Sequence, residues 1–168
     1  LLDIAKTDRR VRGVVGWIDM TARDAPDRLA ALAADPMLKS IRPMWQDLPD
    51  DDFMHRPEIQ PVYRALVDLG LRFDALAKPH HLPLMPRLLE KHPDLALIVD
   101  HGAKPDIAGG GLAAWKRDLK EVASHPHVFC KLSGLVTESG EGVTAADLQP
   151  YVETLIELFG PERLVFGS

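Results

Sequence analysis

One short stretch of the chain, residues 95–105, joins a run of apolar side chains to several groups capable of acid–base or metal chemistry. Apolar residues fill positions 95–99, and Asp100, His101 and Lys104 follow at once. A continuous apolar run of this length is typical of a strand that is buried on both faces of a parallel sheet. In α/β barrels and open α/β sheets, catalytic side chains gather where such strands end. His101 is therefore the first candidate for a catalytic residue.

Other polar side chains lie at or just beyond the carboxyl end of an apolar stretch. They are Asp19, Arg42, Gln46, Asp74, Lys78, His80, His81, Asp100, Lys104, Lys131 and Ser133. A parallel sheet brings the carboxyl ends of its strands to one rim, so we expect these groups to converge. Any one of them is also explained by the polar character of loops. The convergence of several is what indicates a site.

Strand-like and helix-like patterns alternate along the whole chain. Strands are predicted at residues 13–20, 39–45, 71–77, 95–101, 128–133 and 163–168. Capping residues and apolar side chains at helical spacing predict the intervening helices: one opening at Asp24, one ending at Gly70, one over 84–91, one through Trp115 and one starting at Thr144. Strict alternation of this kind implies an α/β fold, with a parallel sheet and right-handed crossovers.

Composition narrows the class of protein. A length of 168 residues suits one domain, and a net charge of −5 argues against binding nucleic acid through phosphate neutralisation. No apolar run approaches the roughly 18 residues of a membrane span, and charges interrupt the first residues too early for a signal peptide. The single cysteine, Cys130, cannot form an internal disulfide. These features predict a reduced, cytoplasmic environment without a membrane partner.

Two further segments contain residues that could form a site. His125 and His127 form a His-x-His pair of the kind that binds metals, but they precede a strand and so belong to the opposite rim of the sheet. Residues 46–57 form the least regular stretch, with four acids and two prolines. This stretch is either a solvated connection or an active-site loop.

Five segments in order resemble the amidohydrolase-related proteins of the sugar-lactonase type. They are Phe73-Asp74, the run 79–83 (PHHLP), the run 99–105 (VDHGAKP), the run 130–135 (CKLSGL) and the closing 166–168 (FGS). The resemblance implies a (β/α)8 TIM-type barrel and hydrolysis of a small lactone, either sugar-derived or carboxylated. It also implies one divalent metal, such as zinc, in some subgroups and none in others.

The resemblance assigns roles to residues of this chain. His101 would be the active-site histidine, either a metal ligand or a group that polarises the lactone carbonyl while water attacks. The substrate would contact Arg42, Gln46, Asp74, His80, His81, Lys104 and Lys131. His81 departs from the family pattern, in which Gln often follows the first histidine.

The two ends of the chain depart further from the family. Members begin with a strand that carries a His-x-His pair and continue beyond the last strand to an aspartate, and neither feature occurs here. Six strand patterns are found where the barrel needs eight, with the first two strands missing and two edges open. We therefore expect residues 1–168 to be one incomplete barrel domain, a fragment that is inactive alone and active in the intact protein.

Two other functions stay open at this point. A metal-dependent decarboxylase of the same superfamily would share the barrel and release carbon dioxide instead of a proton. A non-catalytic remnant would pair its open edges with another chain and would form an oligomer. A homo-oligomer is compatible with the lactonase interpretation as well.

Overall fold

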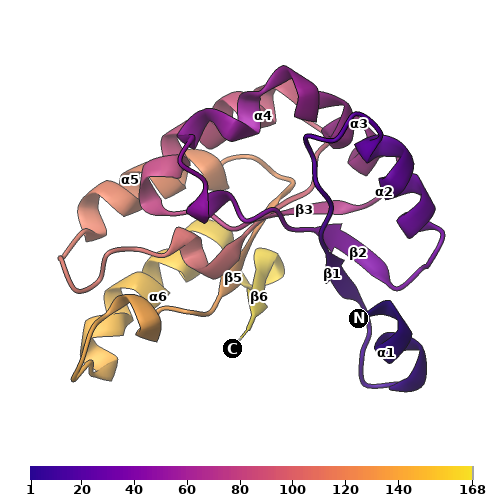
Figure 1. Ribbon diagram of the computed structural model, residues 1–168. Helices are drawn as coiled ribbons and strands as arrows, with labels where there is room; N and C mark the ends of the chain where they lie inside the picture. Colours follow the sequence, from indigo (N-terminus) through magenta and orange to yellow (C-terminus); the bar gives the residue numbers. More distant parts are fainter. Residues whose placement is uncertain (168) are drawn as a thin grey trace.

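A curved parallel sheet, covered by helices on its outer side, forms the body of the protein (Figure 1). The structure is a computed structural model, and it describes residues 1–167. All neighbouring strands are parallel and follow chain order across the sheet. The strands are β1 (Val14–Gly16), β2 (Leu38–Ile41), β3 (Arg72–Ala75), β4 (Leu97–Val99), β5 (Val128–Leu132) and β6 (Leu164–Phe166).

Five helices lie where the sequence predicted them, each between two strands, and a further helix, α1, precedes β1. The helices are α1 (Leu2–Thr7), α2 (Ala25–Ala33), α3 (Gln60–Asp68), α4 (Met85–Lys91), α5 (Leu112–Ala123) and α6 (Ala145–Phe159). Thr144 and Asp147 form the expected capping box at the start of α6. Asp24 precedes α2 as predicted, but its carboxylate binds Arg28 (Oδ2 to Nε, 2.9 Å) instead of capping the helix.

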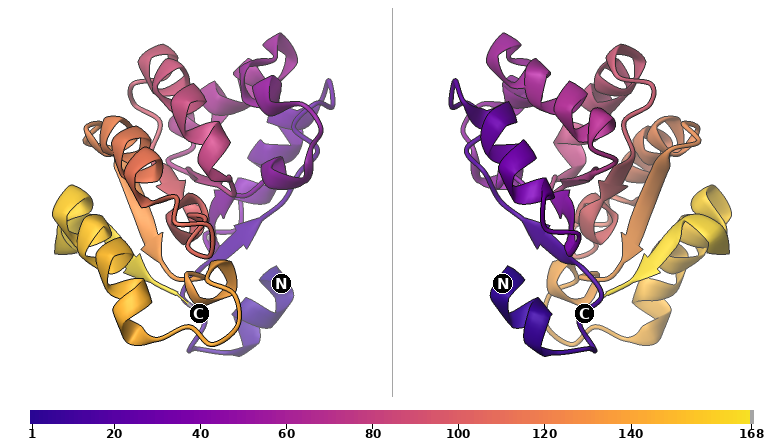
Figure 2. Two further views of the ribbon diagram at one scale, coloured as in Figure 1. Left: turned by 90° about the vertical axis from the view of Figure 1, so that its left-hand side faces the viewer. Right: turned by 90° about the vertical axis from the view of Figure 1, so that its right-hand side faces the viewer.

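The six strands curl into part of a TIM-type barrel, as expected from the sequence (Figure 2). Alternate residues of a strand point to opposite faces of the sheet. On β3, Phe73 points outward and meets the ring of Tyr63 on α3 edge-on, with ring centroids 5.4 Å apart. Its neighbour Asp74 points to the inner face, where it contacts Ser40 and Lys131. Burial against the helices therefore aims the polar residues of the strands into the barrel.

The observed strands are shorter than the predicted ones at their carboxyl ends. Residues 100–101 belong to a 3-10 turn, Asp100–Ala103, instead of extending β4. Similar 3-10 segments follow three other strands: Trp45–Asp47, Asp51–His55 and Pro57–Ile59 after β2, Pro79–Leu84 after β3, and Val136–Glu138 after β5. The end of the sixth predicted strand, Ser168, lies outside the described residues. These turns build the rim where functional groups were expected.

The edges of the sheet are open among residues 1–167. Among the described strands, β1 pairs with β2 alone and β6 pairs with β5 alone. Near these edges Trp17 is 62% exposed and Phe166 is 86% exposed. Cys130, in contrast, is buried in the middle of β5, and burial raises the pKa of its thiol to about 12. No helix in the described part of the chain is long and apolar enough to cross a membrane.

Candidate active site

Four charged side chains and one hydroxyl from β2–β5 and their ends form a single network on the inner face of the sheet. The ammonium group of Lys131 lies 2.5 Å from Asp74 Oδ2 and 2.5 Å from Asp100 Oδ1. Arg42 Nη1 lies 3.5 Å from Asp100 Oδ2, and the Ser40 hydroxyl donates to Asp74. Both carboxylates are fully buried. The two carboxylates and the two cations cancel, so the network carries no net charge.

The ion pairs within the network decide which of its charged groups remains available to a substrate. Burial lowers the pKa of the Lys131 ammonium, but its hydrogen bonds to Asp100 and Asp74 outweigh this effect, and the pKa is raised overall. Lys131 is therefore a cation near pH 7 whose charge is taken up by two carboxylates. Arg42, with its side chain 40% exposed, is the most accessible of the four charged groups.

His101 stands beside this network, immediately after Asp100 in the chain. Its Nδ1 lies 2.8 Å from the Ser133 hydroxyl, at the end of β5. The backbone of Gly134 packs against the imidazole so closely that a Cβ there would lie 2.9 Å from His101 Cγ. Burial lowers the pKa of His101, partly opposed by the charge of Asp100. His101 is therefore a neutral imidazole near pH 7, with its ring held on two sides.

The ring orientation determines what His101 can do. Residues 1–167 supply no hydrogen-bond partner for its Nε2, whereas Nδ1 is engaged by Ser133. When Nδ1 donates its proton to the Ser133 hydroxyl, Nε2 presents a lone pair. A lone pair on a neutral imidazole can bind a metal ion or accept a proton.

Two other predicted residues lie in the surrounding loops. The Lys104 ammonium is 3.9 Å from Glu138 Oε1, so its charge too has an acidic neighbour. Gln46 donates from Nε2 to Asp47 at 3.2 Å, while its amide oxygen is buried without a hydrogen-bond partner in the described part of the chain. An orphaned acceptor of this kind is what a ligand hydroxyl or a water satisfies.

His80 and His81 belong to a second cluster, with Asp51 from the loop after β2. Both Nε2 atoms lie 3.3 Å from Asp51 Oδ1. His81 is 1% exposed and packs on the Trp45 ring, with centroids 4.4 Å apart. Burial is the main cause that lowers the pKa of His81, and the nearby charge of His80 lowers it further. The ligand atoms of Asp51, His80 and His81 lie within 4.8 Å of one another, close enough for a metal site.

The hydrogen bonding of His81 nevertheless disfavours a metal there. The backbone N–H of Lys78 donates to Nδ1 of His81 at 3.0 Å, so the Nδ1 lone pair is occupied. A neutral ring then carries its proton on Nε2, the atom that faces Asp51. Only His80 and Asp51 would remain as ligands, and both are more than half exposed. Within the described residues the buried Nε2 of His81 makes no hydrogen bond, so its 3.3 Å approach to Asp51 Oδ1 is an electrostatic contact.

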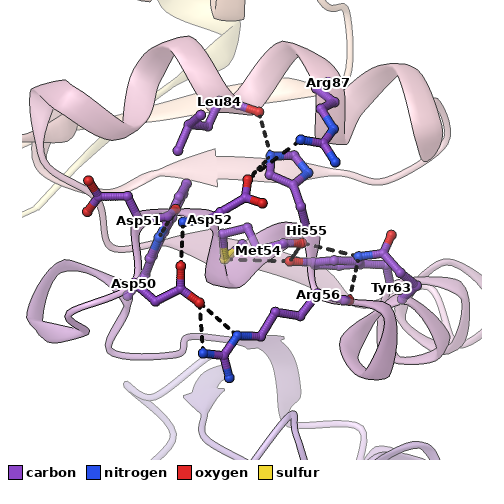
Figure 3. Close-up of polar contacts among 11 residues, drawn as sticks. Asp50, Asp51, Asp52, Met54, His55, Arg56, Tyr63, Leu84 and Arg87 are labelled. Atoms are coloured by element: carbon purple, nitrogen blue, oxygen red, sulfur yellow. Dashed lines mark hydrogen bonds and ion pairs between the residues drawn. The ribbon is translucent and has the colours of Figure 1, made fainter.

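The irregular stretch 46–57 is anchored to its surroundings by a hydrogen bond and an ion pair (Figure 3). His55 Nε2 lies 3.0 Å from the carbonyl oxygen of Leu84, and Arg87 lies 3.6 Å from Asp52 Oδ1. Within the stretch, Arg56 binds Asp50 through Nε at 2.8 Å. The stretch is thus attached to the connection between β3 and α4. Whether it also contacts a substrate stays a prediction.

The structure therefore divides the predicted site residues into two groups. Arg42, Asp74 and Lys131 meet at the network beside His101, whereas His80 and His81 face the loop after β2. Sequence reasoning missed Ser40 and Asp51, which bind Asp74 and the two histidines. Ser40 carried a signal, because it shares the inward parity of Arg42 two residues later. Asp51 carried none, being one of four acids in an irregular loop.

Comparison with known proteins identifies the family. The Amidohydrolase family profile matches residues 1–168. An L-fucono-1,5-lactonase of Burkholderia ambifaria is 45% identical over 168 residues, covering 100% of this chain and 58% of the relative. An L-fucono-1,5-lactonase of Burkholderia multivorans is 32% identical over 191 residues, covering 100% of this chain and 60% of the relative.

Solved structures agree with the fold. A zinc-bound amidohydrolase from Burkholderia multivorans superposes with a TM-score of 0.91 at 34% identity, covering 99% of this chain and 61% of that one. The chain thus spans about three fifths of the length of the relatives it matches, consistent with the partial barrel. With the profile matched from end to end and six parallel strands in chain order, this chain belongs to the amidohydrolase family.

Proposed function

We propose that the intact protein hydrolyses a small, uncharged, sugar-derived lactone, with His101 in the active site. The observation that carries the proposal is the placement of His101: a neutral imidazole at the carboxyl rim, fixed through Nδ1, with Nε2 facing no partner among residues 1–167. The 45% identity to an L-fucono-1,5-lactonase over the whole chain supports the same reaction class.

Charge pairing at the rim favours an uncharged lactone over a carboxylated one. Lys131 is shared by two carboxylates, Arg42 faces Asp100, and Lys104 faces Glu138. A substrate carboxylate would have to compete with these acids for every one of these cations. Hydroxyl groups of a sugar lactone, in contrast, can hydrogen-bond to Arg42 and to the orphaned oxygen of Gln46 without disturbing the pairs.

The residues of this chain fit one position of a metal site. With Nδ1 held by Ser133, His101 presents Nε2 as a neutral ligand of the kind zinc prefers. A bound divalent ion would supply a Lewis acid for the lactone carbonyl and a more acidic water. Among residues 1–167 no acid, cysteine or second histidine joins His101 in a group of three ligands. Further ligands are therefore proposed to come from the rest of the intact protein.

The contribution of His101 itself follows from its chemistry. Water attack on the carbonyl builds negative charge on oxygen and releases a proton, so the site needs an electrophile and a base. His101 Nε2 can hold the electrophile or accept a hydrogen bond from the attacking water. The substrate is the small-molecule partner that this proposal requires. A cytoplasmic location and self-association stay predictions.

Proton release by the intact enzyme tests the proposal. A pH-indicator assay with L-fucono-1,5-lactone, other sugar lactones and a carboxylated lactone measures hydrolysis above the spontaneous rate. We expect turnover of sugar lactones, and a loss of at least about 100-fold in kcat/KM for His101→Asn, since loss of general acid–base function alone costs 10²–10⁴-fold.

His125→Asn is the matched control. It makes the same change at a histidine just before β5, at the opposite rim, and should leave turnover unchanged. Near-normal activity of His101→Asn would overturn the role of His101. Release of carbon dioxide from carboxylated substrates, without lactone opening, would replace the proposed reaction with decarboxylation.

A further inference from the structure

The turn that carries His101 has an unusual backbone. Four successive residues have positive φ angles: His101 (52°), Gly102 (59°), Ala103 (58°) and Lys104 (51°). Only Gly102 adopts this left-handed region without steric strain. One hydrogen bond within the turn, from the Lys104 N–H to the His101 carbonyl oxygen at 2.9 Å, closes it. Such a conformation persists only where the surroundings hold it.

The hydrogen bond to the middle of this turn comes from α5. Trp115 Nε1 donates to the Gly102 carbonyl oxygen at 2.7 Å. The Trp115 side chain is 1% exposed and packs against Tyr151 of α6, with ring centroids 5.4 Å apart. Gly102 is buried as well, so its carbonyl has no access to bulk water as a substitute. The bond is therefore a rigid tie between the helix layer and the rim.

We propose that Trp115 is a positioning residue for catalysis: its indole N–H fixes the left-handed turn and thereby aims the His101 imidazole. This inference rests on the proposed role of His101. The imidazole ring and the backbone of the turn are tied to different parts of the fold, so loss of the Trp115 bond frees the backbone and leaves the contacts of the ring in place. Ser133 and Gly134, which directly follow β5, hold the ring, and Trp115 on α5 holds the next peptide unit.

Loss of the indole bond should release the backbone while leaving the groups that bind substrate in place. Arg42 and Gln46 reside on the loop after β2, and within the described residues no hydrogen bond joins either of them to Trp115. We therefore expect a fall in kcat with little change in KM. A displacement of a reacting group by about 1 Å costs on the order of 100-fold in rate, so a loss of about 10- to 100-fold is expected.

The sharpest test changes one atom group in the intact enzyme. Replacing Trp115 with 3-benzothienylalanine puts sulfur in place of the N–H and keeps the size and shape of the side chain. Two quantities are measured: kcat and KM for lactone hydrolysis, and amide hydrogen exchange of the peptide covering residues 100–106. We expect a lower kcat and faster exchange in that peptide, with unchanged exchange in β5. Trp115→Phe, which also lacks the N–H, provides a second variant.

Val122→Ala controls for a general weakening of α5. Val122 is fully buried on the same helix, two turns beyond Trp115, and is not part of the turn. This variant should retain the kcat of the wild type and its exchange at residues 100–106. Wild-type kcat and exchange in the benzothienyl enzyme would overturn the proposal, and so would faster exchange with unchanged kcat. If the wild type hydrolyses no lactone, the proposed function fails, while the exchange data still test the tie to the turn.

Discussion

Replacing Lys131 with methionine probes the buried charge network most directly. Methionine has a similar length and no charge, so Lys131→Met removes the ammonium with little change in volume. In the folded protein this ammonium lies 2.5 Å from each of two carboxylates, those of Asp74 and Asp100, which have no solvent exposure. Ser40 would still donate to Asp74, and Arg42 would still face Asp100 at 3.5 Å. Each carboxylate would thus keep one partner and lose its nearest cation.

The expected loss of stability follows from the burial of the orphaned acids. Removal of one partner of a buried ion pair costs about 3–5 kcal/mol, because the remaining charge is left without compensation. That range corresponds to a rise of roughly 100- to 4,000-fold in the unfolding constant. The pKa of Lys131 is raised, so the stabilisation is complete below its ordinary value of 10.5 and is lost only above that pH. A measurement at pH 7 therefore records the full effect.

Equilibrium urea unfolding of the intact protein measures the difference in the free energy of unfolding between Lys131→Met and the wild type, as a shift in the urea midpoint. Lys116→Met is the matched control: Lys116 forms an equally short pair with Glu157, 2.5 Å, but at the surface, where little change is expected. In the Lys131→Met background, Asp74→Asn should restore part of the stability, since it removes one orphaned charge. Equal stability of Lys131→Met and Lys116→Met would refute the reasoning.

Two further predictions concern the packing of histidines. Gly134→Ala places a methyl group 2.9 Å from His101 Nδ1 at a φ of +68°, so we expect at least about tenfold lower kcat. Gly142→Ala, at a φ of +75° with no atom within 4 Å, should leave the steady-state rate unchanged. His92 has a pKa lowered by burial, so the unfolded chain binds more protons below pH 6.5 and stability falls there. His92→Gln should make the urea midpoint less dependent on pH between 7 and 5, and an unchanged slope would contradict this assignment.

The fold was largely predictable because its signals are local. Apolar runs predict buried parallel strands wherever they occur, and all six were confirmed, as was each helix between them. The errors lie at the carboxyl ends, where 39–45 was predicted as strand and the strand ends at Ile41. Beyond Ile41 the chain leaves the sheet to form loops of the rim. Apolar side chains there, such as Trp45, pack in the core without being part of a strand.

The clustering of polar residues at the rim was predictable, and their pairings were less so. Parallel strands bring their carboxyl ends together in any register, so the meeting of Arg42, Asp74 and Lys131 followed from topology alone. Lys131 neutralises two acids because of the stagger of β3, β4 and β5, and this stagger cannot be read from the sequence. The contact between Asp51 and His81 depends on the path of an irregular loop, which must be known before the contact can be predicted.

The left-handed turn at His101 shows how the fold and the proposed site depend on each other. Three of its residues, His101, Ala103 and Lys104, are not glycine, and each costs roughly 1–2 kcal/mol in this conformation. No local preference selects such a turn, so tertiary contacts must stabilise it. Those contacts come from Trp115 on α5 and from Ser133, the residue after β5. Both of these supports of His101 lie within residues 1–167, so the aim of the imidazole depends on how α5 packs against β5.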